Sequence, residues 1–233
     1  MTEDVVPAPG TAPVAPGAVR VRVWDLPTRV THWTLVVVIG VLWWTAETGR
    51  MEWHRWAGYT MLALLLFRLY WGFFGSSTAK FSGFVRGPRA IGQYFKGNWS
   101  PAAGHNPLGA LSVLALLGLL LLQVGLGLFA VDVDGIESGP LSLYVSFETG
   151  RAAAEWHEIV FTALQVLVAL HIVVVFYYLL GKRQNLVGAM FSGKRRFENA
   201  VAPMTPGTWP RLVVGIVIAV SITWAISKAF KFG

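Results

Sequence analysis

The chain of 233 residues is apolar and poor in charge. Hydrophobic residues make up 55% of it and charged residues 13%, which is about half the fraction found in ordinary soluble domains. This composition excludes a disordered chain and argues against a soluble globule. The chain has no Cys, which excludes disulfides, Cys-ligated zinc and iron–sulfur clusters. Its net charge of +7 does not indicate a nucleic-acid partner, because Lys and Arg in so apolar a chain typically mark the cytoplasmic side of a membrane.

Five apolar runs are long enough, or nearly so, to cross a bilayer as helices, for which about 20 residues are needed. They cover residues 30–46, 56–74, 106–131, 159–181 and 212–227. The fifth run is the shortest, and it can span if Lys228 extends its ammonium group to the interface. The sequence therefore predicts an all-α integral membrane protein with a four-helix bundle and a fifth, C-terminal transmembrane helix.

The chain divides into three predicted segments. Residues 1–19 are rich in Pro and Ala and are expected to form a flexible cytoplasmic tail, residues 20–200 the four-helix core, and residues 201–233 the additional helix. Lys and Arg are concentrated before the first helix and in the second and fourth connections. By the positive-inside rule, the N-terminus is expected in the cytoplasm and the C-terminus across the membrane.

The positions of the histidines are the most informative feature of the sequence. His32 opens the first predicted helix from the cytoplasmic side, whereas His54 and His157 open the second and fourth helices from the other side. His171 follows His157 by 14 residues, so it lies about 21 Å further along the same helix, within about 40° of the same direction. An ionisable group deep in a spanning helix indicates a function.

Matching these depths gives two pairs, His54 with His157 and His32 with His171. Two stacked imidazole pairs inside a four-helix bundle suit two haems, each with two axial His ligands. Without Cys the haem cannot be attached covalently, so both are expected to be haem b. With both axial positions filled, such a centre transfers electrons and does not activate oxygen. For any single His, an interfacial position or a hydrogen bond between helices is the alternative.

Four further residues are candidates for contacts with cofactors. Arg68 follows His54 by 14 residues and faces the same way, so it is a candidate partner for a haem propionate, with a cation reaching to the interface as the alternative. Arg29, three residues before His32, is a second candidate. His105 and Asn106 open the third helix on the cytoplasmic side and could bind a quinone headgroup, or simply cap that helix.

The sequence resembles the bacterial cytochrome b561 and nickel–iron-hydrogenase cytochrome b subunit family over about residues 20–200. The resemblance is carried by residues 23–29 (VWDLPTR) with His32-Trp33, 54–58 (HRWAG), 104–110 (GHNPLGA), Trp156-His157-Glu158, Leu170-His171 and 185–194. It implies a core with two haem b groups and the same ligand pairs, in the bacterial inner membrane. It also implies electron exchange between a periplasmic partner and the quinone pool, with the quinone near His105 and Asn106.

The partner is left open between a c-type cytochrome and a dehydrogenase or hydrogenase. Residues 131–158, read as a periplasmic loop, carry six acidic residues and one Arg, which favours a basic partner such as a c-type cytochrome. A direct superoxide:quinone oxidoreductase of the resembled family is the alternative function. Such members oxidise superoxide at a positively charged periplasmic surface, and this loop has the opposite sign. Whether the chain alone catalyses a quinone half-reaction, and whether it forms a homo-oligomer, stay open.

Two functions of other classes are also considered. A proton or metal transporter could use the histidines as a relay, but no repeated or broken helices of the transporter kind are evident in the sequence. A structural anchor for a periplasmic enzyme would need the histidines only for packing.

Overall fold

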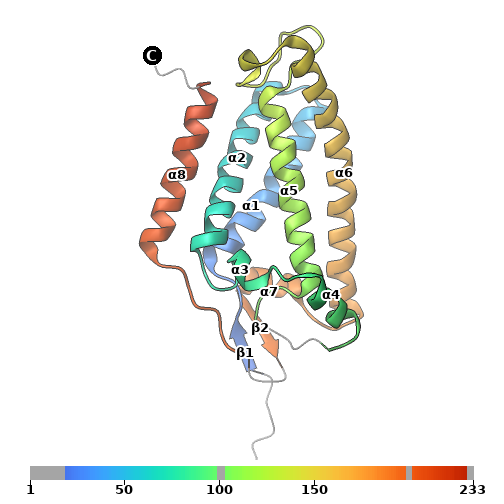
Figure 1. Cartoon of the computed structure of the whole chain (residues 1–233), viewed down its shortest axis with the longest axis vertical. Helices are drawn as coiled ribbons and strands as arrows, with labels where there is room; N and C mark the ends of the chain where they lie inside the picture. Colours follow the sequence, from blue (N-terminus) through green and yellow to red (C-terminus); the bar gives the residue numbers. More distant parts are fainter. Residues whose placement is uncertain (1–18, 99–102, 198–200, 230–233) are drawn as a thin grey trace, which may run out of the picture.

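The computed structural model describes residues 19–98, 103–197 and 201–229 and contains five helices that are long and apolar enough to cross a membrane (Figure 1). The predicted tail, residues 1–19, lies outside the described residues apart from Val19. The five helices are α1 (Leu26–Glu47), α2 (Met51–Phe74), α5 (Pro107–Phe129), α6 (Phe147–Leu180) and α8 (Trp209–Ser227). The prediction of an all-α, multi-pass membrane bundle is confirmed.

The long helices begin where a polar side chain can cap them. Asp25 accepts a hydrogen bond from the Thr28 backbone N–H at 3.0 Å and starts α1, and Asn106 does the same for α5 through Gly109 N–H at 2.7 Å. Ser146 caps α6. These bonds satisfy backbone donors that have no partner within the helix.

Helix α6 begins earlier than the hydropathy pattern predicts. It starts at Phe147 rather than near residue 159, because the Ser146 cap and a charged first segment extend the helix beyond the apolar run. Its 34 residues span about 51 Å, which exceeds the roughly 30 Å hydrocarbon thickness. His157 therefore lies in the third turn instead of at the helix start, and Glu148, Glu155 and Glu158 lie on the helix instead of in a loop.

The helices pack as two antiparallel pairs with α8 on the outside. Helix α1 packs along α2 and α5 along α6, while α2 also contacts α5 and, on its other side, α8 (Figure 1). The bundle core is formed by Val38, Met61, Leu65, Leu117, Leu120 and Leu164. Gly215 lets α8 approach α2 closely, since a Cβ there would lie 2.5 Å from Tyr70 Cδ1.

The two ends of the bundle differ (Figure 1). One, called here the sheet end, carries α3 (Phe81–Phe84), α4 (Pro88–Phe95), α7 (Leu186–Ser192) and the antiparallel strands β1 (Val19–Arg22) and β2 (Lys194–Phe197). The other, the loop end, carries residues 130–146 with the 3-10 turn η1 (Ser142–Tyr144).

The two-stranded sheet is an addition to the predicted fold. Val21 and Phe197 face inward from its two strands and are each 6% exposed. They share a small core with Val23, Trp24 and Ala189 of α7, so the first and last parts of the four-helix segment are joined.

The close approach at Gly215 can be tested by substitution. Gly215→Val should weaken the docking of α8 on α2 and lower the free energy of unfolding by about 1–3 kcal/mol, because the new side chain meets the Tyr70 ring. Unfolding in a denaturing-detergent titration measures the change. Val217→Leu, which enlarges a side chain that is 56% exposed on the same helix, is the control. Equal stability of the two variants would contradict the packing role.

Candidate haem-binding site

The four histidines of the predicted pairs lie on three helices. His32 is on α1, His54 on α2, and His157 and His171 are both on α6. Because α1 runs from the sheet end towards the loop end and α2 runs back, His32 lies near the sheet end and His54 near the loop end (Figure 1). Helix α6 runs in the direction of α2, so His157 is at the depth of His54 and His171 at the depth of His32.

The rings of His54 and His157 face each other between α2 and α6. Their centroids are 6.3 Å apart and their planes are inclined by 74°. An imidazole nitrogen binds a first-row metal at about 2 Å, so two imidazoles on opposite sides of one metal have ring centres about 6 Å apart. The separation therefore fits two axial ligands of one iron.

Backbone carbonyls fix the orientation of both rings. His157 Nδ1 lies 2.9 Å from Gln123 O, and His54 Nδ1 lies 3.1 Å from Leu42 O. A carbonyl oxygen only accepts hydrogen bonds, so each Nδ1 carries the proton and each Nε2 of the neutral ring keeps its lone pair. Hydrogen bonds of this kind orient metal-binding histidines in known metal sites.

Two small residues close the packing around this pair. Thr45 is fully buried, and its hydroxyl lies 3.2 Å from His54 Nδ1 while donating to backbone carbonyls of its own helix. On the other side, a Cβ at Gly127 would lie 3.0 Å from His157 Cε1. A larger residue at position 127 would displace the His157 ring.

The second pair, His32 and His171 near the sheet end, has fewer hydrogen bonds to orient its rings than His54 and His157 have. His32 interacts electrostatically with His171, which puts the two rings in the same region. His171 Nδ1 lies 3.3 Å from the Ser112 hydroxyl, whereas His32 Nδ1 is buried without a hydrogen-bond partner among the described residues. His32 also packs edge-on against Trp33, with ring centroids 5.1 Å apart.

The two candidate propionate partners have different surroundings. Arg68 is 9% exposed, with its guanidinium 5.3 Å from the centre of the Phe81 ring and within electrostatic reach of Asp25. Arg29 donates from its side chain to the carbonyls of Met190 and Phe191 at the end of α7. A cation at a helix C-terminus is favourable, so the contacts of Arg29 hold α7 in place, and its propionate role stays a prediction.

His105 is held between two aromatic rings at the sheet end. Its ring centroid is 4.7 Å from that of Trp24 and 4.6 Å from that of Phe84, and its buried Nδ1 has no hydrogen-bond partner among the residues described. Burial lowers the pKa of His105 to about 3, and the nearby Arg68 and His171 add to the effect. His105 is therefore neutral at physiological pH and can both donate and accept a hydrogen bond.

The side chain of Asn106 is committed to structural contacts. Besides capping α5, it donates from Nδ2 to the Tyr178 hydroxyl at 2.9 Å and to the Tyr94 hydroxyl at 3.2 Å. Burial and the hydrogen bond to Tyr178 raise the pKa of Tyr94 to about 12, so its proton is retained. Sequence reasoning missed both tyrosines, since nothing in the local spacing links α4 with the end of α6.

Asp25 is a third residue that sequence reasoning missed as a contributor to this region. It is 3% exposed; one carboxylate oxygen caps α1 and the other accepts a hydrogen bond from Trp71 Nε1 at 2.8 Å. The carboxylate thus joins the start of α1 to the end of α2. Asp25 lies in the 23–29 motif, and this position could have marked it as a candidate.

Comparison with known proteins assigns the family. A family model described as prokaryotic cytochrome b561 matches residues 23–193, and the chain belongs to this family. The probable Ni/Fe-hydrogenase B-type cytochrome subunit of Azotobacter chroococcum mcd 1 is 24% identical over 217 residues, which cover 77% of this chain and 90% of that protein. No solved structure matches the chain.

Family membership makes the chain a membrane cytochrome b that carries haem b and functions in electron transfer. The imidazole pair between α2 and α6 fits that cofactor, because the ring centroids are 6.3 Å apart and the contact of each Nδ1 with a backbone carbonyl leaves Nε2 for the iron. The resemblance found in the sequence motifs is confirmed.

The link between α1 and α2 gives a testable prediction. Asp25→Ala should lower the free energy of unfolding by about 2–4 kcal/mol, because it removes a helix cap and leaves buried Trp71 Nε1 without an acceptor. Unfolding in denaturing detergent measures it. Asn185→Ala removes the exposed cap of α7 alone and should cost about 1 kcal/mol. A cost for Asp25→Ala no larger than that of Asn185→Ala would contradict the role of the Trp71 bond.

Proposed function

We propose that the chain is a di-haem electron carrier in which His54 and His157 hold one haem b and His32 and His171 hold the other. The observation that carries the proposal is the 6.3 Å separation of the His54 and His157 rings, with both Nδ1 atoms at hydrogen-bonding distance from backbone carbonyls. When bound, haem b would be held by these imidazoles and would supply one-electron oxidation and reduction.

The second pair is supported by the course of α6. His157 and His171 share a face of one continuous helix at two depths about 21 Å apart, and His32 lies within electrostatic reach of His171. Two sites at different depths are what electron transfer from one face of a membrane to the other requires. Arg68 is the proposed cation for a propionate at the sheet end, because it is buried there without a described ion pair.

We propose that quinone reacts at the sheet end, beside His105. A neutral imidazole can hydrogen-bond a quinone carbonyl and pass a proton, and His105 lies within electrostatic reach of His171. Asn106 contributes by holding the hydroxyls of Tyr94 and Tyr178 next to this position. The proposed orientation in the bacterial inner membrane places this end, the N-terminus and most Lys and Arg residues in the cytoplasm.

At the loop end we propose a periplasmic redox partner. The relative from Azotobacter is named as a hydrogenase subunit, which supports a hydrogenase or another dehydrogenase. The loop itself exposes Val133 and Ile136 between the acidic residues Asp132, Asp134 and Glu137. Glu137 pairs with Arg55 of α2, so the loop is tied to the helix that carries His54. An apolar, acid-flanked surface of this kind is complementary to a partner with basic residues around its own apolar contact, including a c-type cytochrome.

Haem content of histidine variants tests the ligand pairs. His157→Ala and His171→Ala should each retain about half of the wild-type haem b, because each removes one axial ligand of one pair. Haem per chain is measured by pyridine haemochrome absorbance, and the reduced-minus-oxidised spectrum shows which centre remains. His105→Phe is the matched control, since this His is not a proposed ligand.

Three outcomes of that experiment would contradict the proposal. Full haem in both ligand variants would favour a transporter or a structural anchor. Loss of haem in the control would show that the ligand set is wrong. An identical residual spectrum in the two ligand variants would mean that the histidines do not divide into the two proposed pairs.

A second experiment tests the quinone position. His105→Leu should slow quinone reduction or quinol oxidation about tenfold or more while haem content is unchanged, because Leu offers no hydrogen bond or proton. His105→Gln keeps a donor and an acceptor and should retain part of the activity. The rate is followed by stopped-flow absorbance of the haem with a soluble quinone analogue. An unchanged rate in the Leu variant would put the quinone elsewhere.

A further inference from the structure

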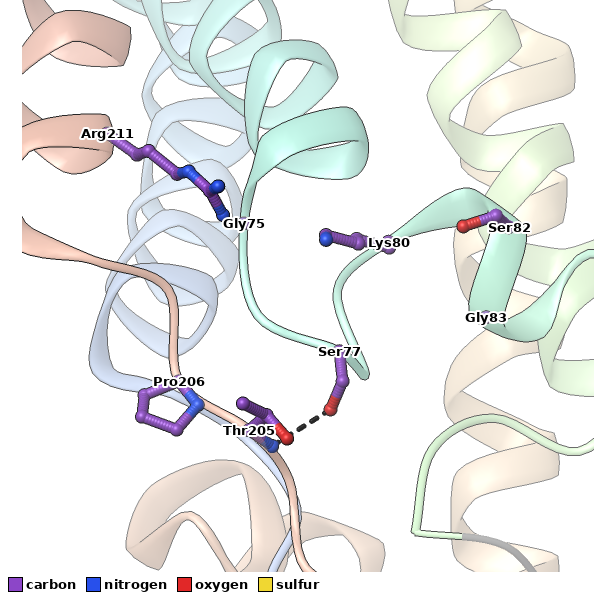
Figure 2. Close-up of a pocket in the computed structure, with 8 residues that line it drawn as sticks. All are labelled: Gly75, Ser77, Lys80, Ser82, Gly83, Thr205, Pro206 and Arg211. Carbon is purple, nitrogen blue, oxygen red and sulfur yellow. Dashed lines mark hydrogen bonds between the residues drawn. The ribbon is translucent and has the colours of Figure 1, made fainter.

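A cavity of about 320 Å³ that is open to solvent lies at the sheet end, between the end of α2 and the start of α8 (Figure 2). Ser77 and Lys80 line it from the connection between α2 and α3, Ser82 from α3, Thr205 from the segment before α8, and Arg211 from α8 itself. None of these residues is a histidine of the two pairs or is described in ring contact with His105, although Ser82 shares α3 with Phe84, which is. The cavity is therefore separate from the proposed electron-transfer sites.

Two cations share this cavity without an anion. Figure 2 shows the side chains of Lys80 and Arg211 reaching towards the same space. No Asp or Glu lines the cavity, and neither cationic side chain has a hydrogen bond or ion pair among the described residues. Two like charges that face one space repel each other. An anion placed between them would attract both cations, so the net electrostatic energy would become favourable.

Hydroxyl groups complete a set of donors. Ser77 Oγ accepts a hydrogen bond from the Thr205 backbone N–H at 2.9 Å, and the Ser77 N–H donates to Thr205 O at 3.0 Å. These two bonds fix the cavity walls relative to each other and leave the Ser77 hydroxyl proton available. Ser82 and Thr205, which also carry hydroxyl groups, are among the residues that line the cavity. Oxyanions such as phosphate are bound by this combination of Lys, Arg and hydroxyl donors.

The surroundings of the cavity place it at the level of lipid headgroups. Helix α2 ends with Phe73 and Phe74, which are 64% and 51% exposed, and α8 begins with Trp209, which is 73% exposed. Exposed aromatic residues at the ends of spanning helices lie at the membrane interface. A basic cavity between two spanning helices at this depth is suited to the headgroup of an anionic lipid.

We propose that this cavity binds a phosphate oxyanion, supplied by an anionic phospholipid, between Lys80 and Arg211. The lipid would connect α8 to the connection between α2 and α3, since Arg211 and Lys80 come from these two elements. Free inorganic phosphate has the same oxyanion chemistry, and the experiment separates the two sources. The proposal does not depend on the haem or quinone assignments.

The test compares lipid retention by wild-type protein and by the double variant Lys80→Gln/Arg211→Gln. Delipidated protein is mixed with phosphatidylglycerol or with phosphatidylcholine, and bound lipid is counted by native mass spectrometry. The wild type should bind phosphatidylglycerol at least about tenfold more tightly than phosphatidylcholine, and the double variant should lose this preference. Arg89→Gln/Lys96→Gln, which removes two exposed cations of α4 and its end at the same side of the bundle, should keep it.

A competition with inorganic phosphate identifies the source of the anion. If millimolar phosphate does not displace phosphatidylglycerol, the lipid is the ligand. If phosphate displaces the lipid and itself binds the wild type but not the double variant, the cavity is an oxyanion site, and the lipid is overturned as its ligand in favour of soluble phosphate. Equal binding of both lipids by the wild type, or an equal loss in the Arg89/Lys96 control, would overturn the proposal. Helical circular dichroism of each variant excludes unfolding as the cause.

Discussion

The arrangement of this protein depends on how an imidazole is accommodated inside an apolar helix bundle. A buried ring nitrogen needs a hydrogen-bond partner or a metal, because no water is present to take its place. At the loop end, Leu42 and Gln123 supply backbone carbonyls to the Nδ1 atoms of His54 and His157. That satisfies one nitrogen of each ring and leaves the other nitrogen available to a metal. The polarity of the site is thus confined to a single small region between α2 and α6.

Helix α6 sets the spacing of the two candidate sites. As one uninterrupted helix of 34 residues, it carries both His157 and His171, and their separation is fixed by the helix rise. Helices α1 and α2 are antiparallel neighbours and each carries its histidine near its own start, so His32 and His54 lie at opposite depths. The proposed pairing of His54 with His157 and of His32 with His171 rests on this match of depths.

The features that depend on helix geometry could be predicted from the sequence, whereas contacts between segments far apart in the sequence could not. Hydropathy identified all five spanning helices, and 14-residue spacing identified the shared face of α6. The early start of α6 was missed because the turns after Phe147 are charged and amphipathic, so only the Ser146 cap marks the beginning. The contact of Asn106 with Tyr94 and Tyr178, like the pairing of β1 with β2, joins segments far apart in the sequence. No local pattern specifies such contacts.

The basic residues at the sheet end indicate the orientation in the membrane, and several of them also make specific contacts. Counted only by sign, they predict which end faces the cytoplasm. In the structure they act differently: Arg29 binds the last carbonyls of α7, and Arg195 donates to Gln184 at 2.7 Å. Lys80 and Arg211 instead face a cavity that no acidic residue of the described part of the chain lines. A cation needed only for orientation could lie at any position at this end of the bundle. The convergence of Lys80 and Arg211 on one cavity therefore calls for a local reason, and the proposed anionic ligand supplies one.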